Sequence, residues 1–75
     1  MPRRTDLDKQ WDELMFLCER EKQFQAEDRH QTLLRILVRR IDELARQMGF
    51  SDKQIQGREF RAEKIDGRII QIIRE

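Results

Sequence analysis

Residues 44–57 read LARQMGFSDKQIQG, and this stretch holds the most organised local chemistry of the chain. It predicts a corner at which one helix ends and another begins. Gly49 suits the left-handed conformation that commonly follows a helix end. Ser51 can cap the next helix, and Gln54 three residues later completes an S-x-x-Q capping box. The apolar residues on either side of the cap can pair as a hydrophobic staple: Phe50 and Ile55.

The chain is short enough to limit what it can be. Seventy-five residues make at most one domain, and the core of such a domain is small and marginal when it stands alone. Cys18 is the single cysteine and His30 the single histidine, so neither a disulfide nor a Cys/His zinc site is expected. A partner chain, identical or different, is therefore the expected support.

Cellular location can be argued from the same composition. A lone thiol suits a reducing compartment. The first residues lead into a charged segment rather than the apolar core of a secretory signal. The longest apolar runs, LMFLC and ILV, are too short to cross a membrane. We therefore expect a cytoplasmic protein with no membrane partner.

Apolar residues recur at helical spacing through most of the chain, and none of it alternates like a strand. The clearest seam has apolar residues three and four apart: Leu34, Leu37, Ile41, Leu44 and Met48. We predict one all-α domain over 1–75, folded as a small antiparallel hairpin or bundle. Its expected parts are a tail (1–5) and three helices (6–24, 29–48 and 52–74). A break of the last helix near Gly57 would make four.

No constellation in this sequence points to catalysis. The many acids lie beside basic residues on polar faces, which indicates solvated helix surfaces. General acid–base chemistry needs groups in a cleft, and a chain of this length has little room for one. No glycine-rich phosphate loop is present. We expect a protein that is not an enzyme, with no cofactor, no bound metal and no small-molecule substrate.

The corner also has the spacing of a DNA-reading motif. A small residue, a glycine four positions later and an apolar residue six further on are supplied by Ala45, Gly49 and Ile55. Residues 41–61 thus resemble the helix-turn-helix of phage repressor-type regulators. That resemblance implies a dimeric DNA-binding transcriptional regulator. Its base- and phosphate-contacting residues would be Lys53, Gln54, Gln56, Arg58 and Arg61. Arg58 departs from the motif, which favours an apolar residue there.

Apolar residues that lie off the helical stripes favour a different function. Bulky residues without a place in one core need a second contact surface. Our first hypothesis is a small interaction protein, a regulator or adaptor. It would form a homodimer through its second and third helices and bind a partner protein through an apolar helix face. The residues expected at these contacts are Phe16, Phe60, Ile65, Ile69, Ile70, Ile72 and Ile73. The DNA-binding regulator remains open as the alternative.

Overall fold

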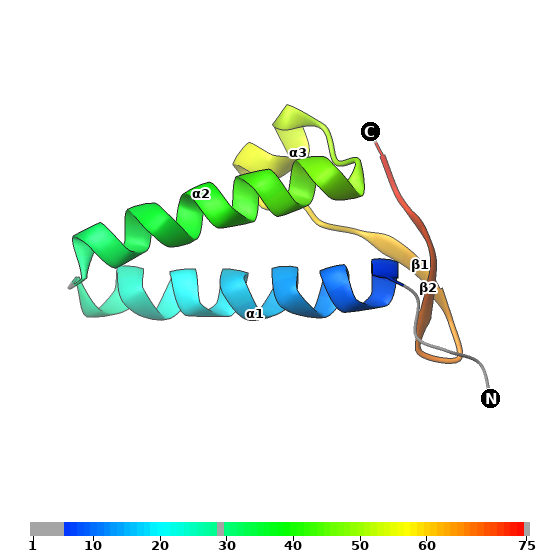
Figure 1. Cartoon of the computed structure of the whole chain (residues 1–75), viewed down its shortest axis with the longest axis horizontal. Helices are drawn as coiled ribbons and strands as arrows, with labels where there is room; N and C mark the ends of the chain where they lie inside the picture. The colour runs from blue at the N-terminus through cyan, green and yellow to red at the C-terminus, as the bar shows by residue number, and fades with distance from the viewer. Residues whose placement is uncertain (1–5, 29, 75) are drawn as a thin grey trace.

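The computed structural model describes residues 6–28 and 30–74. Its elements, in chain order, are α1 (Asp6–Glu27), α2 (Gln31–Met48), α3 (Asp52–Gly57), β1 (Ala62–Ile65) and β2 (Arg68–Ile72). Helices α1 and α2 lie side by side and antiparallel, α3 packs beside the end of α2, and the two strands lie near the start of α1 (Figure 1). The predicted tail (1–5) and the predicted start of the second helix at residue 29 lie outside the described residues.

The two long helices and their apolar stripes confirm the sequence-based prediction, with ends that differ by two or three residues. On α1 the buried apolar residue is Leu14, and Trp11 and Cys18 pack partly buried against the same cluster. On α2 the seam buries Ile41 and Leu44 almost completely. Apolar burial at this spacing holds the two helices together as a hairpin.

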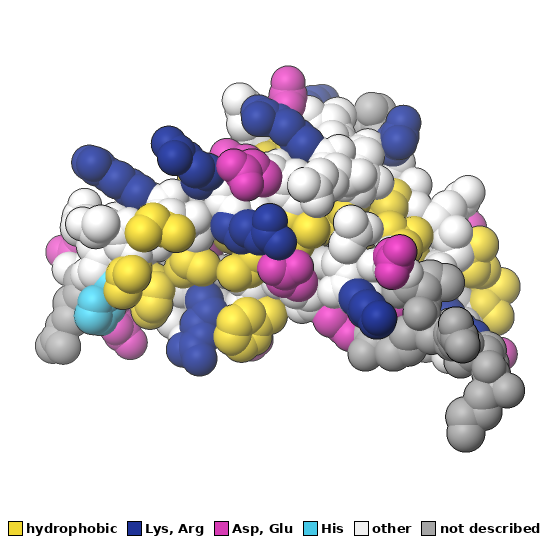
Figure 2. All heavy atoms as spheres, in the orientation of Figure 1, with side chains coloured by type: hydrophobic (Ala, Val, Ile, Leu, Met, Phe, Trp, Pro, Cys, Tyr) yellow, Lys and Arg dark blue, Asp and Glu magenta, His cyan; other side chains and the backbone are white. Residues whose placement is uncertain are grey.

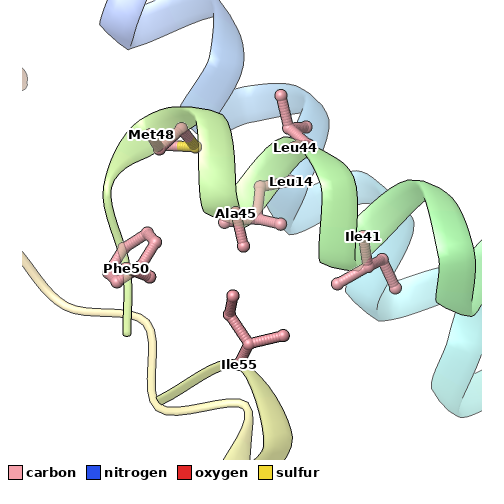
Figure 3. Close-up of a cluster of buried hydrophobic side chains, with 7 residues drawn as sticks. All are labelled: Leu14, Ile41, Leu44, Ala45, Met48, Phe50 and Ile55. Carbon is pink, nitrogen blue, oxygen red and sulfur yellow. The ribbon is translucent and has the colours of Figure 1, made fainter. Parts of the chain in front are cut away.

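The corner after α2 forms as predicted. Gly49 is left-handed at φ 105°, and its N–H donates to the carbonyl oxygens of Ala45 and Arg46. The capping box is complete: Gln54 N–H donates to Ser51 Oγ, and Ser51 N–H donates to Gln54 Oε1. The staple residues are both buried in the core shown in Figure 3: Phe50 and Ile55.

The predicted single helix over 52–74 is wrong. Helix α3 stops at Gly57, because Arg58 adopts the left-handed conformation at φ 54° and its N–H returns to the carbonyls of Gln54 and Ile55. The break that was predicted near Gly57 is therefore present. The chain does not resume a helix after it, so the molecule is mostly helical with a small two-stranded sheet rather than entirely α.

A two-residue turn explains why the isoleucine-rich end forms strands. Asp66 and Gly67 both have positive φ, 53° and 77°, which is the conformation of a tight hairpin turn. The β-branched isoleucines around it favour extended backbone over helix. In the antiparallel pair Lys64 lies opposite Ile69, Glu63 lies opposite Gln71, and the register shift between the two pairs leaves Ile70 as a bulge.

The hairpin is attached to the helices by named contacts. Ile69 is buried, and its backbone N–H donates to the buried carboxylate of Asp8 on α1 at 2.8 Å. Gln54 Nε2 of α3 donates to the carbonyl oxygen of Ile73 at 2.7 Å. The Lys64 ammonium lies over the ring of Trp11, 5.1 Å from its centroid. Helices and sheet thus form one packed unit over the described residues.

Candidate functional site

A groove runs along one side of α2, and we call it the α2 groove. Its central hollow has a volume of about 530 Å³. A second hollow of about 330 Å³ shares Val38, Asp42 and Arg46 with it and reaches α3. A third hollow of about 310 Å³ shares Arg35 and Arg39 with it and lies beside Thr32 and Ile36. The α2 groove comprises these three adjoining open hollows. Together they are lined by Thr32, Leu34, Arg35, Ile36, Val38, Arg39, Asp42, Glu43, Arg46, Ile55, Gln56 and Arg58.

The groove exists because α3 is short. Leu34 and Val38 are four residues apart and therefore lie on the same side of α2. Ile55 of α3 packs beside the later turns of that side. Helix α3 has only six residues and covers no more of α2, so Leu34 and Val38 stay half-buried at the floor of the open part. Ile36, 60% exposed, stands on the rim.

Arginines edge this apolar floor, and two of them are electrostatically available. The side chains of Arg35 and Arg39 make no hydrogen bond or ion pair within residues 6–28 and 30–74. By contrast, Arg40 pairs with Glu13 at 3.1 Å. In Figure 2, Lys and Arg side chains stand along α2 above hydrophobic side chains in the seam with α1. A ligand in the groove would therefore contact two exposed guanidinium groups.

Arg58 closes the α3 end of the groove. Its guanidinium donates to both carboxylate oxygens of Glu21 on α1, at 3.1 and 2.8 Å, and to Asp42 on α2 at 3.1 Å. The hydrogen bond to Glu21 is the largest cause that raises the pKa of Arg58 above its ordinary value. The bidentate pair with the buried Glu21 joins the end of α3 to α1, and the bond to Asp42 joins it to α2. These contacts fix the position of the groove wall.

The structure does not assemble the predicted DNA-contacting set on one exposed surface. Gln54 is 1% exposed and is used by the capping box and by its bond to Ile73. Arg58 is held by Glu21 and Asp42. Lys53, Gln56 and Arg61 are exposed. A six-residue helix is about 9 Å long, which leaves the expected recognition helix incomplete.

Some of the residues predicted to bind a partner are buried in the core, and others are exposed. Ile69 is buried, and Phe60 and Ile72 pack against the core, with the Phe60 ring 4.9 Å from that of Phe50. The exposed members of the set are Phe16, Ile65, Ile70 and Ile73. Phe16 lies two turns beyond the hairpin contact of α1, about 12 Å along the axis, so it is separated from the isoleucines of the hairpin.

Sequence reasoning missed the residues that make the α2 groove. Leu34 was predicted to lie in the apolar seam of the second helix, and Val38, Arg35 and Arg39 were given no functional role. The available signal was the width of the apolar arc, since Leu33, Leu34, Leu37 and Val38 extend around more of α2 than one neighbouring helix can cover. Two arginines four residues apart border that arc.

The described residues give little support for a metal site, a membrane-spanning helix or a reactive thiol. Residues 6–28 and 30–74 contain no group of three His, Cys, Asp or Glu side chains placed to hold a metal ion. None of the helices in these ranges has both the length and the apolar character needed to cross a bilayer. Burial, followed by the nearby Glu21 carboxylate, raises the pKa of the Cys18 thiol, which makes this thiol a poor nucleophile near neutral pH.

Fold and groove together define a small helical hairpin that is closed at one end by a short helix and a β-hairpin and that carries an open, arginine-edged groove with an apolar floor. No protein-family model, curated protein sequence or solved structure matches this chain.

Proposed function

We propose that this protein is a non-enzymatic protein-interaction module, a regulator or adaptor, that binds a helical segment of a partner protein in the α2 groove. The observation that carries the proposal is the half-buried apolar pair Leu34 and Val38 at the floor of an open hollow on α2. Exposed apolar surface in a groove with a polar rim is typical of protein-binding sites.

The dimensions of the groove suit a helix. Its lining extends from Thr32 to Arg46, a rise of about 21 Å along α2. A partner helix of about 14 residues has the same length, and its residues at i, i+4 and i+7 would meet the floor. The wall contributed by Ile55 and Arg58 gives such a helix a defined stop.

The structure also bears on the two other functions expected from the sequence, self-association and DNA binding. Self-association is expected through the second helix and a long third helix, and α3 has six residues, so the third-helix part of that surface is not formed. DNA recognition is expected from Lys53, Gln54, Gln56, Arg58 and Arg61, and two of these, Gln54 and Arg58, are engaged within the fold. Homodimerisation and DNA binding therefore remain predictions, which sedimentation velocity and titration with random-sequence duplex would examine.

Selection of peptides from an unbiased library tests the proposed function. The full chain is immobilised, and displayed random 16-residue peptides are selected for binding. We expect the selected peptides to have apolar residues at helical spacing and to bind the protein with micromolar affinity. Val38→Asp should abolish this binding, because a carboxylate at the floor would be desolvated against the apolar stripe.

Ile65→Asp is the matched control for this experiment. Ile65 is 61% exposed on the hairpin, so the same apolar-to-acid change is made away from the groove. The far-ultraviolet circular dichroism of both variants verifies that they fold. If the selected peptides depend on Ile65 and ignore Val38, or if no peptide is selected, the α2 groove is not the binding site.

A further inference from the structure

We infer that the segment bound in the α2 groove is an acidic amphipathic helix, with its carboxylates placed against Arg35 and Arg39. This inference rests on the proposed function and adds the chemistry of the partner. An apolar floor selects a helix with an apolar stripe, and it gives no preference among flanking charges. The rim residues decide that preference.

The guanidinium groups of Arg35 and Arg39 form an anion-attracting position on the rim of the groove. Arg35 and Arg39 are successive along one face of α2, so their guanidinium groups flank the same stretch of floor, beside Leu34 and Val38. Neither has an acidic partner in residues 6–28 and 30–74. Guanidinium groups pair with carboxylates in bidentate geometry, and a helix with Glu beside its apolar stripe presents carboxylates at the matching spacing.

Acidic side chains lie at the other end of the rim, toward α3. Asp42 is already paired with Arg58 at 3.1 Å and Arg46 with Asp52 at 3.4 Å, whereas the exposed side chain of Glu43 makes no hydrogen bond or ion pair among the described residues. A carboxylate of the partner would be repelled there. The preferred helix is therefore acidic where it passes Arg35 and Arg39, and neutral or basic where it passes Glu43.

Other occupants fit this charge pattern less well. A phosphate backbone would meet only two unpaired guanidinium groups, together with Glu43 and an apolar floor that offers it nothing. A second copy could present the exposed Phe16 with Glu19 from its α1. That contact would join two different surfaces of the chain, which builds open chains or rings unless a two-fold axis brings both pairs of surfaces together.

Three synthetic peptides distinguish these possibilities. Each is a fluorescein-labelled 16-residue helix, and the first two have the same leucine stripe. The first has Glu at the positions that pass Arg35 and Arg39, the second has Lys there, and the third is a scrambled form of the first. Fluorescence anisotropy with the full chain at low salt should show binding of the Glu peptide about tenfold tighter than the Lys peptide, since each exposed charge contact changes affinity by roughly 1.5- to 5-fold. The scrambled peptide should not bind.

Charge reversal in the protein identifies the residues responsible. Arg35→Glu/Arg39→Glu should reverse the preference, so that the Lys peptide binds more tightly than the Glu peptide. The control Lys9→Glu/Lys22→Glu makes the same change of net charge on α1, outside the groove, and should keep the original preference. High salt should reduce the difference between the peptides and leave the leucine-dependent binding in place.

Each alternative outcome has a separate meaning. If neither leucine-striped peptide binds, both the groove function and the acidic partner are overturned. If the Glu and Lys peptides bind equally, the groove function stands and the acidic partner is overturned. Displacement of the Glu peptide by random-sequence duplex would assign the arginines to nucleic acid instead. Sedimentation velocity that shows concentration-dependent chains, lost in Arg35→Glu/Arg39→Glu, would assign the groove to a second copy.

Discussion

The carboxylate of Asp8 accepts a hydrogen bond from the backbone N–H of Ile69 at 2.8 Å, and the two residues are 61 positions apart in the chain. Asp8 lies in the first turn of α1, and Ile69 lies in the strand β2. Both are buried. A charged acceptor thus satisfies a buried backbone donor of the hairpin and attaches the hairpin to α1.

Replacement of Asp8 should loosen the hairpin. Asp8→Ala leaves the buried N–H of Ile69 without this acceptor, so we expect the free energy of unfolding to fall by about 1–3 kcal/mol. Asp8→Asn keeps an oxygen acceptor and should cost less. Glu19→Ala, an exposed change on the same helix, should stay within about 0.5 kcal/mol. Urea denaturation gives these values. Amide exchange that is unchanged at residues 62–72 in Asp8→Ala would contradict this role.

The ion pair of Arg58 with Glu21 should contribute far more than an exposed pair. Arg58→Met removes the partner of a buried carboxylate, and we expect a loss on the order of 3 kcal/mol. Arg46→Met is the matched control, because Arg46 pairs with Asp52 at the surface and such pairs contribute at most about 1 kcal/mol. Thermal and urea unfolding compare the two variants.

The double variant Glu21→Met/Arg58→Met separates charge from shape at this pair. It removes both charges together, so it should recover a large part of the stability lost in Arg58→Met. A double variant that is less stable than Arg58→Met by the full effect of a second mutation would show that the unpaired Glu21 charge is not the cause.

Two glycines provide a test of the hairpin turn. Gly67 has φ 77° and open space around its missing Cβ, so Gly67→Ala should cost about 1 kcal/mol through backbone strain alone. Gly57 has no positive φ, and an added Cβ meets only ordinary contacts with the Glu59 side chain at about 3.4 Å. Gly57→Ala should therefore be neutral or stabilising by up to about 1 kcal/mol. If both variants change the melting temperature equally, the turn geometry described for Asp66–Gly67 is wrong.

Stability should decline in alkaline solution because of Cys18. Burial and then Glu21 raise the pKa of this thiol, so the folded state retains the thiol proton at pH values where the unfolded chain has lost it. The contribution is complete below the ordinary thiol pKa of about 8.5 and is lost as pH rises through the raised value. Cys18→Ala should remove this slope from urea midpoints measured between pH 7 and 10. A slope that persists in Cys18→Ala would place its origin in another group.

Local signals predicted the helices and the corner well. The seam from Leu34 to Met48, the left-handed Gly49 and the capping box of Ser51 with Gln54 depend on residues close in sequence, and all are present. The hairpin was missed because isoleucines at 65, 69 and 72 fit a helical period as well as they fit two strands. The deciding signal was Asp66–Gly67, a pair that strongly favours a two-residue turn.

The groove was less predictable, for a physical reason. Its floor is formed by residues that any amphipathic helix would bury, and Leu34 and Val38 are open only because α3 ends after six residues. The end of α3 depends on Arg58, whose contacts with Glu21 and Asp42 span 37 and 16 positions. Contacts at that separation leave no periodic pattern in the sequence.

Binding of a helix in the α2 groove can be observed directly in a ¹H–¹⁵N titration of the full chain with the Glu-bearing amphipathic peptide. Binding in the α2 groove predicts that amide shifts concentrate between residues 32 and 46 and at residues 55–58, with the largest changes beside Leu34 and Val38. The hairpin amides of 62–72 should stay in place. Shifts that concentrate on the hairpin or on the outer face of α1 around Phe16, with α2 unchanged, would contradict the groove as the binding site.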